Sequence, residues 1–97
     1  MNEGFDGQKQ RSALTAAEQA LRALGSGDPD KARKTAAKAA DLDQIGAYAG
    51  FVEAVGPLAQ RLESGVPIDD AGWDGLAAVL GMGPLSALVE QLRGADD

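Results

Sequence analysis

A chain of 97 residues, of which 44% are hydrophobic and 25% charged, has the composition of one folded domain and not of a disordered segment. Its formal charge of −6 disfavours binding to nucleic acids or anionic membranes. The lack of histidine and cysteine removes the usual proton shuttle, the thiolate nucleophile and the common zinc ligands, so we expect a protein that is not an enzyme and holds no metal or cofactor.

The N-terminal half is predicted to form a helical hairpin. Residues 1–11 are polar and contain two glycines, which is typical of a flexible arm. A helix over residues 12–25 is predicted by apolar residues at intervals of three and four: Leu14, Ala17, Leu21 and Leu24. Glycines in the following GSGDP favour a turn, and Asp28 and Pro29 suit the cap and first position of a second helix over residues 29–40.

A longer apolar pattern follows. Asp41 and Gln44 have the spacing of a capping pair and predict a helical segment that runs to about Ser64. Its apolar residues again alternate threes and fours: Ile45, Tyr48, Val52, Val55, Ala59 and Leu62. Pro57 lacks a backbone donor, so we expect a bend or a break near Gly56.

Two short helices are predicted to complete the chain. Asp69 or Asp70 can cap a fourth helix that carries Trp73 and Leu76, and Pro84 can begin a fifth, which ends at Gly94. No alternating run of β-branched residues predicts a strand. The expected fold is therefore all-α, a compact bundle of four to five short helices over residues 12–94, followed by a flexible tail over 95–97.

Residues 13–42 have small side chains at Ala20, Ala32 and Ala39 and a Gly-Asp pair at the turn. In these features the segment resembles one helical hairpin of the tetratricopeptide family, although alanines occupy the aromatic positions of that pattern and no second copy follows. The resemblance implies a protein-interaction scaffold without catalytic activity. It also implies that the later helices or a second chain cover the faces that neighbouring repeats would bury.

Three charged clusters are candidate sites. Asp69, Asp70 and Asp74 surround the start of the fourth helix, but their spacing matches no calcium loop, and acids at a helix N-terminus complement its dipole. Asp28 and Asp30 lack the closing glutamate of a calcium loop. The second helix carries the basic cluster, which is either a solvated face or a dock for a phosphate, an acidic partner or the acidic second half of another copy: Lys31, Arg33, Lys34 and Lys38.

The predicted function is protein–protein interaction, above all homodimerisation. An alanine-rich core buries little area, so apolar side chains of the third and fifth helices gain most by meeting a partner. The predicted partner-binding residues are Phe51, Leu85, Leu88 and Leu92. The fifth helix can equally fold back on its own chain. The alternative is a small-ligand or effector-binding domain, whose pocket between the third and fourth helices is lined by Tyr48, Val52, Trp73 and Leu76.

Sequence features of localisation point to the cytoplasm. No apolar run approaches the roughly 20 residues that span a bilayer. The first ten residues do not combine a basic region with an apolar stretch, as a secretory signal does.

Overall fold

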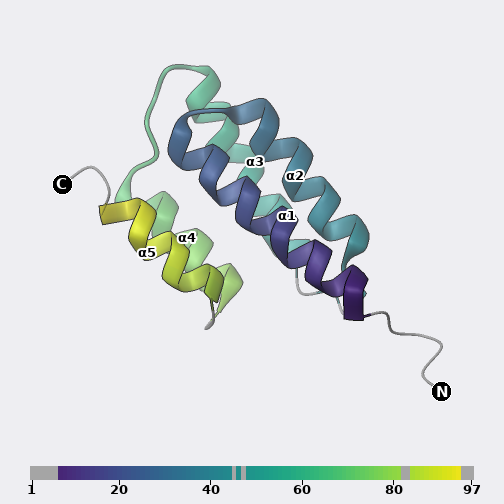
Figure 1. Ribbon diagram of the computed structural model, residues 1–97. Helices are drawn as coiled ribbons and strands as arrows, with labels where there is room; N and C mark the ends of the chain where they lie inside the picture. Colours follow the sequence, from purple (N-terminus) through teal and green to yellow (C-terminus); the bar gives the residue numbers. More distant parts are fainter. Residues whose placement is uncertain (1–6, 45, 47, 82–83, 95–97) are drawn as a thin grey trace.

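Five helices make up most of the part of the chain that the computed structural model describes, residues 7–44, 46, 48–81 and 84–94 (Figure 1). They are α1 (Gly7–Ser26), α2 (Pro29–Leu42), α3 (Ala49–Glu63), α4 (Asp70–Leu80) and α5 (Pro84–Gly94). No strand occurs among these residues. The all-α class and the N-terminal hairpin are confirmed.

The helices form a closed bundle. Each helix packs on the next one in the sequence, and α5 returns to contact α1. In Figure 1 α5 therefore lies beside α1, with α4 beside α3 on the same side of the hairpin. The radius of gyration of 13.3 Å is close to the roughly 13 Å of a compact domain of about 100 residues. The predicted compact bundle is confirmed.

Alanines let α1 and α2 approach each other closely. The facing residues have at most 4% of their surface exposed and are Ala13, Ala16, Ala20 and Ala23 of α1 with Ala32, Ala36 and Ala39 of α2. Gly27 takes the left-handed conformation (φ 77°) at the turn, and the Asp28 carboxylate accepts the Lys31 backbone N–H at 3.1 Å. Pro29 begins α2, so the predicted cap and first position are both confirmed.

The first helix begins at Gly7, five residues earlier than predicted, so residues 7–11 belong to the bundle and not to an arm. The reason is a long-range contact. The Gln10 side chain donates to Asp43 Oδ1 at 2.9 Å and accepts the Gln44 N–H at 3.0 Å, which ties the first turn of α1 to the connection between α2 and α3. Residues 1–6 and 95–97, where we expected flexible ends, lie outside the described residues.

The third helix begins later than its capping pattern predicted. α2 continues through Leu42, and α3 starts at Ala49, because Asp43 serves the connection between them. The Asp43 N–H closes α2 on Ala39, and its carboxylate accepts the Tyr48 N–H at 2.8 Å. Gly46 takes a left-handed conformation in between (φ 74°). Once started, α3 runs through Pro57 as a single helix, so there is no break near Gly56. The bend predicted there stays a prediction.

Two glycines serve opposite ends of α4: Gly81 ends the helix, and Gly72 allows close packing near its start. The Asp69 carboxylate caps α4 by accepting the Gly72 N–H at 2.8 Å, and Gly81 ends the helix with φ 71°. Gly72 faces α3 so closely that a Cβ there would lie 2.8 Å from Leu58 Cδ2 and 2.9 Å from Ile68 Cγ2. A hydrogen in place of a side chain is therefore what lets α4 pack on α3.

Alanine substitutions at two glycines of α4 should have opposite effects. Gly72→Ala should lower the free energy of unfolding by about 1 kcal/mol, because its Cβ forces Leu58 and Ile68 to move. Gly75 has open space around its Cα, so Gly75→Ala should raise that free energy by about 0.5 to 1 kcal/mol through helix propensity alone. Urea denaturation measures both. Equal midpoints for the two variants would show that α4 does not pack this closely on α3.

None of the helices in the described ranges is both long and apolar enough to cross a membrane.

Candidate interaction surface

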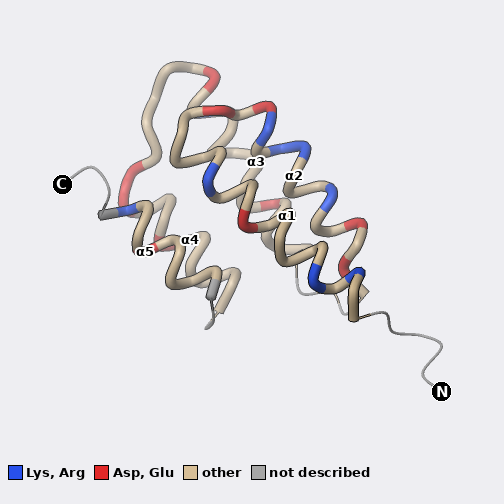
Figure 2. Tube along the Cα trace, viewed as in Figure 1, with Lys and Arg blue, Asp and Glu red and all other residues tan. Residues whose placement is uncertain are grey.

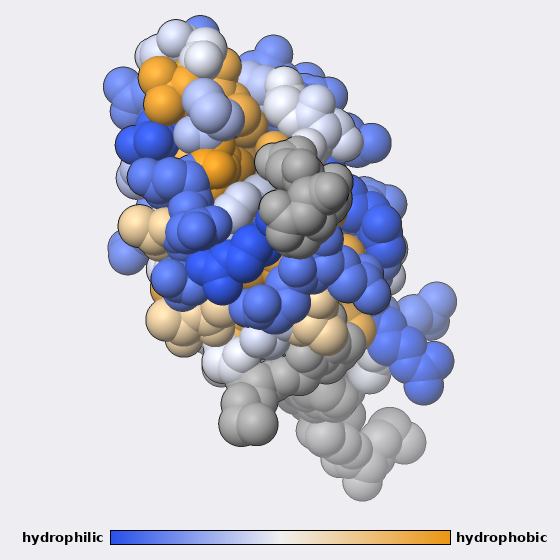
Figure 3. Space-filling model, turned by 90° about the vertical axis from the view of Figure 1, so that its left-hand side faces the viewer, coloured by the Kyte–Doolittle hydropathy of each residue, from blue (hydrophilic) through white to orange (hydrophobic). Residues whose placement is uncertain are grey.

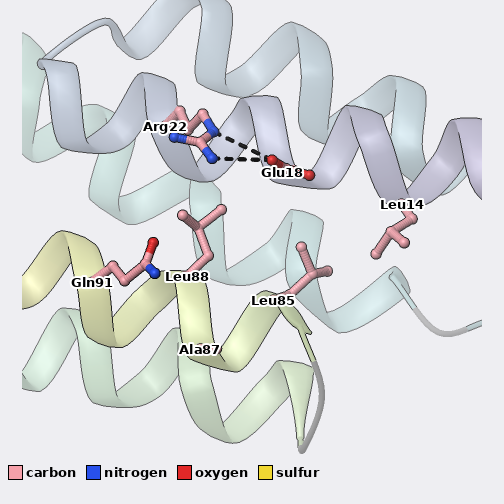
Figure 4. A pocket seen from close by; sticks show the side chains of 7 residues that line it. All are labelled: Leu14, Glu18, Arg22, Leu85, Ala87, Leu88 and Gln91. Atoms are coloured by element: carbon pink, nitrogen blue, oxygen red, sulfur yellow. Dashed lines mark hydrogen bonds and ion pairs between the residues drawn. The ribbon is translucent and has the colours of Figure 1, made fainter.

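A shallow groove runs between α1 and α5. It has a volume of about 200 Å³ and is lined by Leu14, Glu18 and Arg22 of α1 and by Leu85, Ala87, Leu88 and Gln91 of α5. Figure 4 shows the Leu88 side chain reaching from α5 toward α1, with Leu85 and Leu14 further along the same groove. The floor is therefore aliphatic, and the exposed edges are contributed by Ala87, Gln91 and a pair of charged side chains.

The charged pair on the α1 edge has both signs. Arg22 lies one turn after Glu18, and its Nη2 is 3.1 Å from Glu18 Oε1 (Figure 4). Both side chains stay largely exposed, at 59% and 43%. An exposed pair of this kind contributes little to stability. A cation and an anion one helical turn apart form a pattern that a two-fold-related copy of the same surface can match.

The leucines of α5 serve the chain's own core first. Leu85 and Leu88 are each 7% exposed, Leu92 is partly buried, and Val89 between them is fully buried. A Cβ at Gly25 would lie only 2.9 Å from Leu92 Cδ2, so this glycine lets Leu92 pack on the last turn of α1. The predicted partner residues Leu85 and Leu88 thus line the groove, whereas Leu92 packs at the other end of α5.

Contrary to the prediction that it binds a partner, Phe51 does not lie at the surface. Its side chain is 0% exposed and packs edge to face with Tyr48, with ring centroids 6.3 Å apart and an angle of 67°. The buried stripe of α3 is centred on Phe51 and Val55, and Val52 is only partly buried. The predicted apolar stripe begins at Ile45, which precedes α3 and lies outside the described residues. A stripe counted from Ile45 leaves Phe51 beside the buried face and not on it.

The four residues predicted to line a ligand pocket are not brought together in the cavity that Trp73 lines. Leu76 is fully buried and Tyr48 is 8% exposed against Phe51, so both serve the core. Trp73 instead lines a cavity of about 310 Å³ to which Tyr48, Val52 and Leu76 do not contribute. This end cavity is lined by the last residues of α1, by the α1–α2 turn, by residues of α3, α4 and α5, and by the α3–α4 connection: Leu24, Gly25, Ser26, Gly27, Leu62, Pro67, Ile68, Trp73 and Leu92.

Most residues that line the end cavity are hydrophobic, and none is charged. Figure 3 views this end of the molecule and shows hydrophobic atoms gathered in a hollow between hydrophilic ones. Trp73 itself is 7% exposed, so its ring forms a wall of the cavity and does not project into solvent. A wall of this composition suits an apolar ligand better than a charged one.

The acidic cluster at the start of α4 is engaged by an arginine of α5. The Arg93 guanidinium pairs with Asp74, lies 3.7 Å from Asp70 Oδ1, and donates to the Asp70 backbone carbonyl at 2.9 Å. Asp69 caps α4 and lies 3.5 Å from Arg61. Within the described ranges no three acidic residues are grouped closely enough to hold a metal ion. These carboxylates therefore tie α4 to α5 and to α3.

The basic cluster of α2 divides into a paired and an unpaired part. Arg33 Nη2 lies 2.5 Å from Glu63 Oε1, and this hydrogen bond holds the pKa of Glu63 below its usual value. Lys31, Lys34 and Lys38 are exposed and form no ion pair within the described part of the chain. Figure 2 shows the basic residues spaced along α2. The three lysines remain available to an anion.

Tyr48 should make the stability of the fold sensitive to alkaline pH. Burial, together with the nearby Asp43 carboxylate, raises the pKa of Tyr48 above its ordinary value of 10.0. The stabilisation from the neutral phenol is therefore complete below pH 10 and is lost as the pH rises from there through the raised pKa. Urea midpoints should fall over this range, and Tyr48→Phe should fall less steeply. Parallel curves for the two proteins would contradict the assignment.

Several groove residues were absent from the sequence prediction. Leu14 was recognised as an apolar position of the first helix but not as a surface residue, because its neighbour α5 is 70 residues away in the sequence. Glu18 and Arg22 carry a local signal, since opposite charges four residues apart pair on a helix. Ala87 and Gln91 carry none.

Comparison with protein-family models, curated proteins and solved structures finds no match to this chain. The tetratricopeptide resemblance of residues 13–42 stays a prediction.

Proposed function

We propose that this protein is a non-catalytic interaction module that forms a homodimer through the groove between α1 and α5. The observation that carries the proposal is the groove itself, an aliphatic floor left open at the surface where the last helix closes the bundle on the first. The absence of histidine and cysteine from the sequence, which removes two common classes of catalytic group, favours a binding role.

A second copy is the occupant that fits the edges of the groove. A two-fold axis places the same surface on both sides of an interface, so that each contact occurs twice. If α1 of one copy runs antiparallel to α1 of the other, Glu18 of each meets Arg22 of its partner. The floors of the two grooves then face one another. The hydrophobic contribution comes mainly from the partly exposed Leu14 and the exposed Ala87, since Leu85 and Leu88 are only 7% exposed. Apolar area provides the affinity and the charges fix the register.

The oligomeric state tests this proposal directly. Light scattering on the eluting peak of a size-exclusion column should give a mass that rises from 9.9 kDa toward twice that value as the concentration increases into the high micromolar range. A constant mass of 9.9 kDa at these concentrations would exclude the homodimer.

The end cavity beside Trp73 favours a second candidate function, the binding of a small apolar ligand. A cavity of about 310 Å³ is at the lower end of the range of small-molecule sites, and its lining contains no charged group. The neutral fluorophore N-phenyl-1-naphthylamine is a suitable probe, because Trp73 forms part of the wall and can transfer excitation to it.

Titration of this probe should quench Trp73 and saturate at one molecule per chain. Ser26 is exposed at the mouth of the cavity, so Ser26→Glu should weaken binding about ten-fold by placing a charge beside an apolar ligand. Ser64→Glu is the control, since Ser64 is also exposed but does not line the cavity. Equal affinities for the two variants would remove this candidate.

A further inference from the structure

A second groove, between α1 and α2, differs in character from the two surfaces above. It has a volume of about 380 Å³ and is lined by Gln8, Arg11, Ser12, Thr15, Ala16, Gln19 and Lys38. Apart from Ala16, every side chain in this lining is polar, two of them are cationic, and none is a carboxylate. In a protein with a net charge of −6, a groove with two cations and no acid is an unusual concentration of positive charge.

Arg11 is the exception among the arginines. Arg22, Arg33, Arg61 and Arg93 each pair with a carboxylate of the chain, namely Glu18, Glu63, Asp69 and Asp74. The guanidinium of Arg11 forms no ion pair within the described ranges, and neither does the ammonium of Lys38. Both cations therefore face the groove with their donors available.

The hairpin positions these groups by simple helical spacing. Arg11, Ser12, Thr15 and Gln19 recur at intervals of one, three and four residues, which places them along one side of α1. Lys38 follows Ala36 on α2 and reaches the same groove from the facing helix. Ala16 forms the floor, with 3% of its surface exposed. The small side chains that bring the two helices together thus also bring the two cations to one place.

We propose that this groove binds the phosphate group of a small phosphorylated molecule. The Arg11 guanidinium offers the paired donors that fit two phosphate oxygens, and Lys38 adds a compact charge from the other side. Ser12 and Gln19 can donate further hydrogen bonds. The Thr15 hydroxyl already donates to the Arg11 backbone carbonyl at 3.1 Å and contributes to the wall.

A single small anion fits this surface better than a nucleic-acid chain. Asp41 lies three residues beyond Lys38 on α2, and Asp30 lies at the other end of the same helix, so acids flank the lysines at both ends. A polyanion that followed α2 would meet these carboxylates, and the net negative charge of the protein opposes it over the rest of the surface.

Inorganic pyrophosphate is the probe that tests the proposal. Titration into ¹⁵N-labelled protein at constant ionic strength should shift the backbone amides of Arg11, Ser12, Gln19 and Lys38 and should saturate, with a Kd of about 1 mM or tighter. Shifts that increase linearly without saturation, or that spread over all basic residues, would show nonspecific screening and overturn the proposal.

Two variants and a control make the assignment specific. Arg11→Gln and Lys38→Gln should each weaken pyrophosphate binding about five-fold or more, because each removes a charged donor from an exposed position. Arg61→Gln should leave the Kd unchanged, since Arg61 is also exposed but lies outside this groove. An unchanged Kd in Arg11→Gln would refute the site. Tighter binding of a single-stranded oligonucleotide, with shifts along Lys31 and Lys34, would also refute it and assign the surface to nucleic acid.

Discussion

Replacing Phe51 with alanine should destabilise the folded monomer severely, by about 3 to 5 kcal/mol. The ring is fully buried between Tyr48 and the rest of the core, and its removal leaves a cavity that neighbouring helices cannot fill without moving. Because domains of this size have a total stability of roughly 5 to 15 kcal/mol, much of the population should unfold at moderate urea concentration.

Urea denaturation followed by Trp73 fluorescence measures this effect, since Trp73 is buried in the native state. The measurement should be made at low micromolar concentration, where the protein is monomeric and dimer dissociation does not contribute to the free energy of unfolding. Val52→Ala is the control, because Val52 is only partly buried on the same helix and should lose much less stability. A wild-type midpoint for Phe51→Ala would contradict the buried position of Phe51 and would favour the partner-binding role that the sequence predicted.

Replacing Ala87 with arginine should weaken dimerisation about ten-fold or more without unfolding the chain. Ala87 is exposed on α5 at the edge of the groove, so a large charged side chain there blocks the approach of a second copy. It also adds a cation to a groove whose α1 edge already carries Arg22, which disturbs the charge balance of that surface.

Ala37→Arg provides the matched comparison for this variant. Ala37 is an exposed alanine inside α2, away from the groove, so the same substitution should change neither helix content nor the dimer dissociation constant. Sedimentation equilibrium gives that constant for both variants. If Ala87→Arg associates as tightly as Ala37→Arg, the interface lies elsewhere on the molecule.

The sequence predicted most helix starts and missed those that depend on distant contacts. Asp28, Pro29 and Pro84 were assigned correctly, and Asp69 was one of the two caps predicted for α4, because caps and first positions are determined within one turn. The starts of α1 and α3 were wrong, because Gln10 and Asp43 meet across 33 residues and no local pattern reports such a contact. Capping depends on residues within one turn, whereas the contacts that fix the starts of α1 and α3 join residues far apart in the sequence.

The candidate site was predictable only in part, because the spacing of apolar residues is local whereas the packing of α5 on α1 is not. The apolar stripe of α5 was recognised from its spacing, and Leu85 and Leu88 do line the groove. Which surface the stripe covers depends on how the chain closes, and α5 closing on α1 is a property of the whole bundle. Phe51 was predicted to bind a partner, but in a helix that starts at Ala49 its side chain lies on the buried face, in the core.

Methyl NMR on the unmodified protein tests the central proposal most directly, because it identifies which side chains meet across the interface. In an equimolar mixture of ¹³C-labelled and unlabelled chains, an isotope-filtered NOE experiment detects only contacts between two copies. We predict intermolecular NOEs at the methyl groups of Leu14, Leu85 and Leu88, which form the groove floor. The absence of such NOEs at millimolar concentration, or their appearance only at methyl groups outside the groove, would contradict association through α1 and α5.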